Sequence, residues 1–231
     1  MTANPIIVAL DVESADEARR LVAKLGSHVN FYKVGLELYA AAGIEFVREL
    51  IDGGKDVFLD LKMYDIPETV KRATAQVART GVKFLTIHAV SSAMRAAVEG
   101  RADSNLKLLA ITVLTSFGPE DIAEHGYTGT IADLVALRAR LAMDIGMDGV
   151  VASPLEAVAL RRLIGPKKIL VTPGVRSAGA SKGDQKRVAT PLEAMRDGAD
   201  YLVMGRQITR AADPAAEAAR VLDEIGAAWI A

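Results

Sequence analysis

Three charged residues in the pattern Asp60-x-Lys62-x-x-Asp65 carry the clearest chemical potential in this sequence. The segment Val57–Lys62 that leads into them is otherwise apolar, and it is predicted to form a strand. Because side chains alternate along a strand, Asp60 and Lys62 share one face and the leucines beside them share the other. Carboxylates near a lysine favour its ammonium form. The pattern therefore predicts a lysine that donates a proton, rather than a neutral amine that attacks a carbonyl.

Two more charged residues belong to predicted strands. Asp11 ends the segment Ile6–Asp11, and Lys33 lies within Phe31–Gly35. If these strands are parallel neighbours, four charges of alternating sign converge on one partly dry cavity at the carboxyl ends of the strands. A structural ion-pair network is the alternative, and Asp11 and Asp65 could be ordinary helix N-caps.

A second group of residues follows the last two predicted strands. Arg176 ends the segment Thr172–Arg176, a loop beyond it holds Gly183-Asp184-Gln185, and Gly205 and Arg206 follow the eighth strand. Backbone N–H groups beside a glycine, together with an arginine that can bond two oxygens, are typical of a phosphate site at this end of a βα barrel. The group predicts a phosphate site, with a surface loop of solvated charges as the alternative.

Four other polar residues give weaker signals. Thr115 follows the fifth predicted strand, where its hydroxyl could bond the polar edge of a ligand or cap a helix. His88 ends the fourth predicted strand, and it either faces the site or is a hydrogen-bonded core residue. We expect His28 and His125 to be surface residues.

The elements that must position these residues alternate along the chain. Short apolar runs rich in β-branched residues recur between longer segments with helical periodicity. The eight predicted strands are Ile6–Asp11, Phe31–Gly35, Val57–Lys62, Phe84–Ala89, Leu106–Leu114, Gly149–Ser153, Lys168–Pro173 and Tyr201–Gly205. Eight βα units close most economically as an α/β fold of the (β/α)₈ barrel type, and residues 1–231 are predicted to form a single domain. An open doubly wound sheet is the rival, although the first strand is not followed by its Gly-rich turn.

Composition narrows the class of protein. The chain has 28 basic and 29 acidic residues, a formal net charge of −1, which does not favour binding to nucleic acid. It has no cysteine and only three histidines, so thiolate chemistry is excluded and we expect no metal site. No stretch is long and apolar enough to suggest a signal peptide or a membrane span. We therefore expect a soluble, cytoplasmic protein.

The motifs also occur together in a characteristic order. In sequence they are Asp11, Lys33, Asp60-x-Lys62-x-x-Asp65-Ile66-Pro67, Thr172-Pro173-Gly174-Val175-Arg176, Gly183-Asp184-Gln185 and Gly205-Arg206. Across essentially the whole chain, this conjunction resembles the orotidine 5′-monophosphate decarboxylase family. The resemblance implies a homodimeric (β/α)₈ barrel that converts orotidine 5′-monophosphate to uridine 5′-monophosphate and CO₂, in pyrimidine biosynthesis, without a metal or organic cofactor.

The resemblance also implies a role for each matching residue. Lys62 would donate the proton, Asp60 and Lys33 would complete the catalytic group, and Asp65 would reach into the site of the neighbouring subunit. For the substrate, the resemblance implies that Asp11 and Lys33 bond the ribose hydroxyls and that Thr115 bonds the pyrimidine edge. It implies that Gln185 bonds both base and phosphate, and that Arg176, Gly205 and Arg206 bind the phosphate. The other substrate-binding residues that it implies are Asp60, Ile66 and Thr69.

The charges suit this chemistry. Loss of CO₂ from C6 of the orotate ring leaves a carbanion in the ring plane, which only electrostatic contacts can stabilise, and a fixed ammonium does so before it supplies the proton. The closest alternative is a Mg²⁺-dependent sugar-phosphate decarboxylase or aldolase of the same barrel group, which has an acidic residue where this chain has Lys33. A barrel that only binds a nucleotide or sugar phosphate is a third possibility.

Overall fold

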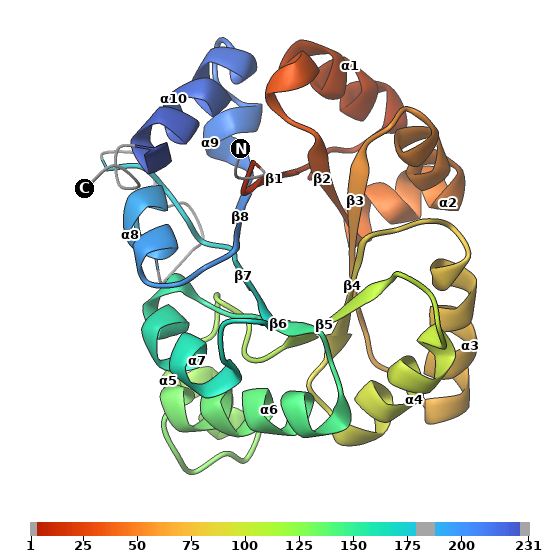
Figure 1. Ribbon diagram of the computed structural model, residues 1–231, viewed down its shortest axis with the longest axis vertical. Coiled ribbons are helices and arrows are strands. Elements are labelled where there is room, and N and C mark those ends of the chain that lie inside the picture. Colours follow the sequence, from red (N-terminus) through yellow and green to blue (C-terminus); the bar gives the residue numbers. More distant parts are fainter. Residues whose placement is uncertain (1–3, 179–187, 227–231) are drawn as a thin grey trace.

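The computed structural model describes residues 4–178 and 188–226, and its centre is a closed barrel of eight parallel strands (Figure 1). Each strand pairs with the next along the chain, and β1 also pairs with β8 to close the ring. The strands are β1 (Ile6–Ala9), β2 (Phe31–Gly35), β3 (Asp56–Met63), β4 (Phe84–His88), β5 (Lys107–Ile111), β6 (Gly149–Val151), β7 (Ile169–Thr172) and β8 (Tyr201–Met204). The predicted (β/α)₈ barrel is confirmed, and the open sheet is excluded.

Helices surround the barrel on its outside (Figure 1). They are α1 (Ala15–Leu25), α2 (Leu36–Asp52), α3 (Pro67–Ala78), α4 (Ser91–Arg101), α5 (Pro119–Glu124), α6 (Ile131–Ile145), α7 (Ala157–Ile164), α8 (Pro191–Arg196), α9 (Arg206–Thr209) and α10 (Pro214–Gly226). In the described ranges, no helix combines the length and apolar character that crossing a membrane requires.

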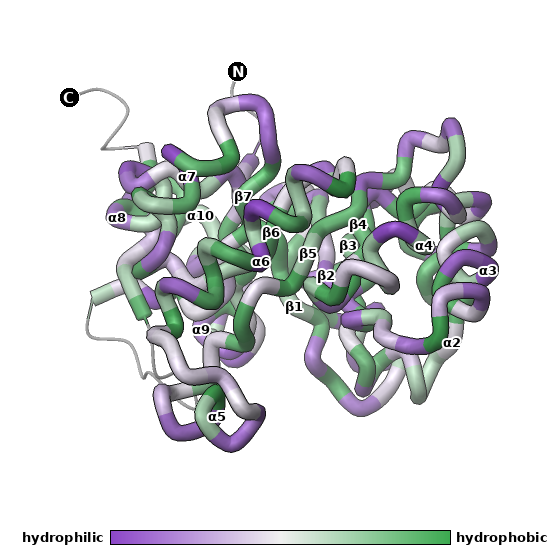
Figure 2. Tube along the Cα trace, turned by 90° about the horizontal axis from the view of Figure 1, so that it is seen from below, coloured by the Kyte–Doolittle hydropathy of each residue, from purple (hydrophilic) through white to green (hydrophobic). Residues whose placement is uncertain are grey.

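Two hydrophobic layers hold the fold together. One fills the space between the strands and the helices, where Leu59 is fully buried. The other fills the interior of the barrel and includes Phe58, Ile111 and Val171. Phe58 and Leu59 are consecutive residues of β3, so the alternation of side chains along a strand assigns them to different layers. In Figure 2 the strands are mostly hydrophobic, while hydrophilic residues gather on the outer turns.

Local signals fix where several helices begin and end. The Ser14 hydroxyl accepts the Glu17 N–H at 3.3 Å at the start of α1. Pro67 is the first residue of α3, where a missing N–H costs little. Gly146 ends α6 in the left-handed conformation, with φ 96°.

One helix pair packs unusually closely. A Cβ added at Gly100 of α4 would stand 2.2 Å from the carbonyl oxygen of Lys71 in α3. Only a residue without a side chain allows the two backbones to approach so closely. This contact fixes the position of α3, the helix that follows β3.

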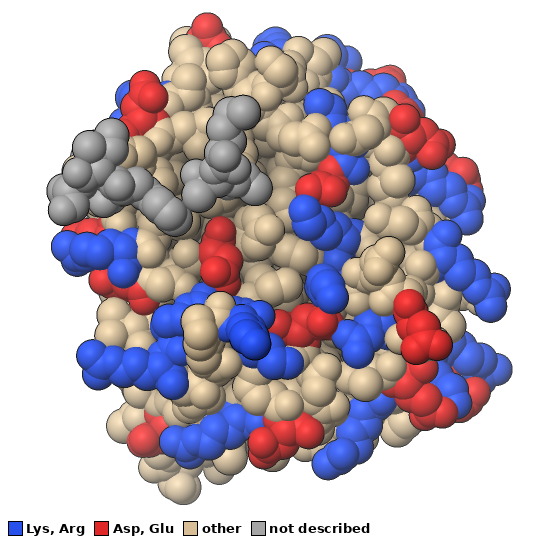
Figure 3. All heavy atoms as spheres, viewed as in Figure 1, with Lys and Arg blue, Asp and Glu red and all other residues tan. Residues whose placement is uncertain are grey.

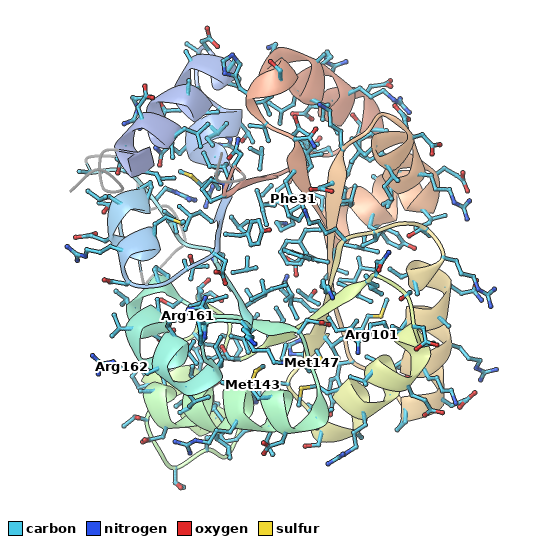
Figure 4. All side chains as sticks on the ribbon, in the orientation of Figure 1. Phe31, Arg101, Met143, Met147, Arg161 and Arg162 are labelled. Carbon is cyan, nitrogen blue, oxygen red and sulfur yellow. The ribbon has the colours of Figure 1, made fainter. Side chains whose placement is uncertain are left out.

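Aromatic side chains fill the barrel at the amino ends of its strands. Phe31, Phe84 and Tyr201 meet edge to face, with ring centroids 5.1 to 5.6 Å apart. Figure 4, which views this end, shows Phe31 inside the ring of strands. The barrel is thus filled at one end, so a ligand must enter from the other.

Candidate active site

A cavity of about 300 Å³ opens at the carboxyl ends of the strands. Its volume lies at the lower end of the range for small-molecule sites. Residues from several separate strands and loops line it, and eight of them were predicted from the sequence: Asp11, Lys33, Asp60, Lys62, Thr115, Arg176, Gly205 and Arg206.

Carboxylates and ammonium groups alternate across the floor of this cavity. The Lys33 Nζ donates to Asp11 Oδ1 at 2.8 Å and lies 3.8 Å from Asp60 Oδ2. The Lys62 Nζ donates to the same Asp60 oxygen at 2.9 Å. Asp60 therefore lies between two cations, as the strand alternation predicts. The structure contains the ion-pair network of the alternative interpretation too, but it lines an open cavity rather than a closed core.

Asp60 and Lys33 are the most deeply placed of these groups, and each has only 8% of its surface exposed. Burial by itself raises the pKa of the Asp60 carboxyl. The ammonium groups of Lys33 and Lys62 and the hydrogen bonds from Lys62 and Thr86 outweigh burial, and they hold the pKa of Asp60 below its ordinary value. Asp60 is thus a carboxylate at neutral pH, and it presents a negative charge to anything in the cavity.

The backbone of β3 is irregular where Lys62 leaves it. The pairing of β3 with β4 shifts register between Leu59 and Met63, and Lys62 has φ 49°. A residue with a side chain rarely adopts this left-handed conformation, and such residues often occur at functional sites. At this irregular point of the strand, the Lys62 ammonium contacts the Asp60 carboxylate.

Thr86 of β4 joins these two residues, and the sequence analysis missed it. Its hydroxyl donates to Asp60 Oδ1 at 2.9 Å and accepts the Lys62 backbone N–H at 2.9 Å. Thr86 is fully buried. Threonine is common in strands because of its β propensity, so Thr86 did not stand out in the sequence. Its alternation with Phe84, which faces the barrel interior, was the available signal.

Gly35, at the end of β2, leaves room for the Lys33 side chain. A Cβ added at Gly35 would lie 2.9 Å from the Lys33 Nζ and 3.4 Å from Asp11 Oδ1. With a side chain at position 35, the flexible lysine would have to move. Gly35 is therefore a second residue that matters for the site and that the sequence motifs do not include.

Two arginines meet at the other side of the cavity. Arg176 follows β7, and Gly205 and Arg206 follow β8. Burial of Arg176 and the charge of Arg206 both lower the pKa of the Arg176 guanidinium. Two cations that repel each other are suited to bind a phosphate between them. Gln185 and the rest of Gly183-Asp184-Gln185 lie outside the described residues.

Comparison with known proteins shows the family to which this chain belongs. The family model described as "Orotidine 5'-phosphate decarboxylase / HUMPS family" matches residues 4–221. The chain belongs to this family. The match spans both halves of the site, from Asp11 to Arg206.

Among curated relatives, the chain is similar to two proteins named orotidine 5'-phosphate decarboxylase. The one from Nitrobacter winogradskyi is 54% identical over 220 residues, which cover 95% of this chain and 92% of the relative. The one from Methylobacterium sp. strain 4-46 is 51% identical over 226 residues, 96% of each. The crystal structure of orotidine 5'-phosphate decarboxylase from Lactobacillus acidophilus superposes with a TM-score of 0.85 and 37% identity, covering 96% of this chain and 99% of that one.

Three residues from the family resemblance do not line this chain's cavity: Asp65, which it assigns to the site of the neighbouring subunit, and Ile66 and Thr69, which it assigns to the substrate. Asp65, Ile66 and Thr69 lie at the start of α3 and are exposed, and 67% of Ile66 is accessible. The Asp65 carboxylate accepts the Ile66 N–H at 2.6 Å. Within one chain of this orotidine 5'-phosphate decarboxylase family member, these residues form an exposed edge beside the active site.

The structure also locates the residues that gave weaker signals. Thr115 lines the cavity. His88 lines a neighbouring cavity instead, with its ring centroid 6.0 Å from that of Tyr64. His28 and His125 are exposed, as predicted.

The charged residues that line the cavity do not cancel. Among the described residues, four cations, from Lys33, Lys62, Arg176 and Arg206, face two carboxylates, from Asp11 and Asp60, which leaves two positive charges in excess. Across residues 4–178 and 188–226, no group of three or more His, Asp or Glu side chains is arranged to hold a metal ion. The cavity suits an anionic ligand such as a nucleotide.

Proposed function

We propose that this protein converts orotidine 5′-monophosphate to uridine 5′-monophosphate and CO₂, the last step of UMP synthesis. The observation that carries the proposal is the buried Asp60 carboxylate between the Lys33 and Lys62 ammonium groups, in a cavity that also holds Arg176 and Arg206. A nucleotide with a phosphate at one end and a carboxylate on its base matches both halves of that cavity.

Each half of the cavity has its own task. Arg176 and Arg206 bind the phosphate, with the backbone of Gly205 close by. Asp11 and Lys33 bond the ribose hydroxyls, and Thr115 bonds the pyrimidine edge. These contacts hold the orotate ring with C6 facing Lys62 and its carboxylate facing Asp60.

Lys62 acts where charge develops. As CO₂ leaves, the electron pair of the broken bond remains on C6 in the ring plane, and the Lys62 ammonium stabilises it without any solvent reorganisation. The same ammonium then transfers its proton to C6. Thr86 fixes the lysine backbone and the Asp60 carboxylate in the required relation.

The excess of two positive charges explains how substrate and product differ in binding. A phosphate dianion balances that excess, and the product carries no other charge. The substrate carries one more negative charge on its carboxylate, which lies beside Asp60. Release of CO₂ removes this repulsion, while the remote phosphate contacts keep the nucleotide in place.

The Mg²⁺-dependent alternative does not fit the same geometry. The Lys33 Nζ lies 2.8 Å from Asp11 and 3.8 Å from Asp60. An ammonium thus occupies the space between the two carboxylates that a divalent cation would need, and it repels such a cation.

The proposal includes a homodimer in which Asp65 completes the site of the neighbouring subunit. Its support is the exposed edge at the start of α3, where Tyr64 and Ile66 are 66% and 67% accessible. Mixing inactive Asp65→Ala and Lys62→Ala proteins tests it, because a mixed dimer contains one site with both residues intact. Recovery of activity on mixing supports the shared site, and no recovery in a verified mixed dimer contradicts it.

The proposed reaction is tested directly. EDTA-treated protein is mixed with orotidine 5′-monophosphate, and the loss of orotate absorbance is followed, with Lys62→Ala in parallel. We expect metal-free turnover that falls at least ~10³-fold in the variant, since a general acid typically contributes 10²–10⁴-fold and the ammonium also stabilises the carbanion. A folded wild-type protein without turnover would refute the proposal, and turnover only with Mg²⁺ would favour the alternative. Our proposal places the reaction in the cytoplasm, which cell fractionation tests.

A further inference from the structure

A second cavity adjoins the active site, between α1 and the segment formed by α9 and α10. It measures about 380 Å³ and shares Asp11 and Arg206 with the catalytic cavity. We call it the α1–α9 groove. Its other charged lining residues are Glu17, Arg20, Lys24 and Arg210.

Like charges are paired on both walls of this groove. Arg20 and Lys24 stand four residues apart on α1, and Arg206 and Arg210 stand four residues apart on the facing wall. The Arg210 N–H donates to the Arg206 carbonyl at 3.1 Å, so these two residues are one helical turn apart. Like charges at this spacing repel each other and destabilise a helix. Two such pairs line one cavity, and the repulsion within each pair does not stabilise the fold.

The described part of the chain compensates little of the positive charge of Arg20, Lys24 and Arg210. Asp11 is bonded to Lys33, which leaves Glu17 as the other carboxylate of the lining. The side chains of Arg20, Lys24 and Arg210 form no hydrogen bond or ion pair with the described part of the chain. The neighbouring Arg19 differs, because it binds both Asp16 and Glu49. The charges of Arg20, Lys24 and Arg210 are therefore left available for an anion.

We propose that the α1–α9 groove binds a phosphate or diphosphate group. Arginine forms paired, charge-assisted hydrogen bonds with phosphate oxygens, and three arginines line this groove. The group comes either from free inorganic diphosphate or from the outer phosphates of a nucleoside di- or triphosphate whose first phosphate lies at Arg206. Because Arg206 belongs to both cavities, an anion in the groove competes with substrate. That competition rests on the proposed function, whereas the binding itself does not.

Calorimetry with inorganic diphosphate tests the binding at constant ionic strength. The test variant is Arg20→Ala/Arg210→Ala, and the matched control is Arg95→Ala/Arg162→Ala, which removes two exposed arginines elsewhere. We expect the test variant to weaken binding at least tenfold and the control to stay within twofold of wild type. Equal losses in both variants, or no loss in either, would overturn the proposal. This measurement needs no turnover, so it also stands if the decarboxylase activity fails.

Inhibition of decarboxylation distinguishes the two sources of the phosphate group. The inhibitors are uridine 5′-mono-, di- and triphosphate and inorganic diphosphate. If the nucleotide supplies the phosphate group, inhibition of the test variant by the di- and triphosphates weakens at least tenfold, and inhibition by the monophosphate weakens less than twofold. If free diphosphate supplies it, only inhibition by diphosphate weakens. Equal weakening for all four inhibitors would show that Arg20 and Arg210 belong to the substrate's own phosphate site, and would overturn a separate groove.

Discussion

The two ends of this barrel treat charge in opposite ways. At the amino ends of the strands, Lys83 pairs with Asp56 and Arg161 with Asp200, both at 2.6 Å. Figure 3, which views this end, shows blue and red side chains next to each other. At the carboxyl ends, cations outnumber carboxylates around an open cavity. Charges that the chain neutralises itself stabilise the fold, and charges that it leaves in excess are available to a ligand.

The paired charges at the amino end also bind the backbone. Asp200 accepts the Leu170 N–H at 2.7 Å, while Arg161 donates to the carbonyls of Gly198 and Lys168. In Figure 4, Arg161 of α7 and Arg101 of α4 lie beside the strands, while Arg162 of α7 extends outward. These contacts join the starts of the strands to the helices that precede them.

Asp148→Ala gives the largest expected change in stability. Asp148 binds Arg101 and accepts the Leu108 N–H at 2.9 Å, with both side chains less than 20% exposed. Removal leaves a mostly buried guanidinium and an N–H without their acceptor, so we expect urea denaturation to show a loss of roughly 3 kcal/mol of unfolding free energy. At 25 °C kcat should stay within twofold of wild type, and the exposed Asp144→Ala is the control. A folded Asp148→Ala protein with a much lower kcat would show that the two ends are coupled.

Thr86→Val tests the catalytic end with a change of nearly equal shape. The variant loses the hydroxyl between Asp60 and the Lys62 N–H, so we expect kcat to fall about tenfold and unfolding free energy by about 1–3 kcal/mol. KM should change less than kcat. Thr86→Ser keeps the hydroxyl and should recover most of kcat, and failure of that recovery would assign the effect to packing.

Gly35→Ala separates activity from stability more cleanly. The added methyl displaces only the end of the Lys33 side chain, so thermal unfolding should shift by no more than a few degrees. Moving Lys33 away from Asp11 and Asp60 should lower kcat/KM several-fold. A variant with unchanged kcat/KM would show that the position of the Lys33 ammonium is not critical.

The smallest expected effect concerns pH. Burial, followed by the charges of Arg138 and Lys62, lowers the pKa of His88 below its usual value. As pH falls below about 6.5, the unfolded chain therefore binds a proton that the native protein does not, and stability decreases until the native pKa is reached. His88→Gln should flatten the decrease in chemical denaturation between pH 6.5 and 5. An unchanged slope would assign the proton uptake to other groups.

Sequence periodicity predicted the strands of this molecule much better than it predicted the contacts between side chains. The alternation in β3 placed Asp60 in the barrel mouth, and the glycine and arginines after β7 and β8 were correctly grouped. The register shift at Lys62 was not predictable, because it depends on how β3 pairs with β4. Alternation with Phe84 could have placed Thr86 inside the barrel, but the contacts of its hydroxyl with Asp60 and the Lys62 N–H depend on that same pairing. The predicted ends of β1 and β5, at Asp11 and Leu114, lie two and three residues beyond the observed ones, because the chain turns toward its helices earlier.

The left-handed backbone at Lys62 has a consequence for redesign. A non-glycine residue at φ 49° carries a conformational cost of about 1–2 kcal/mol that glycine would avoid. A selection for heat resistance alone is therefore drawn toward glycine at this position, and it would remove the ammonium group along with the strain. Directed evolution of a more durable form of this protein needs a screen for turnover at every round, because a change that relieves this backbone strain eliminates the chemistry.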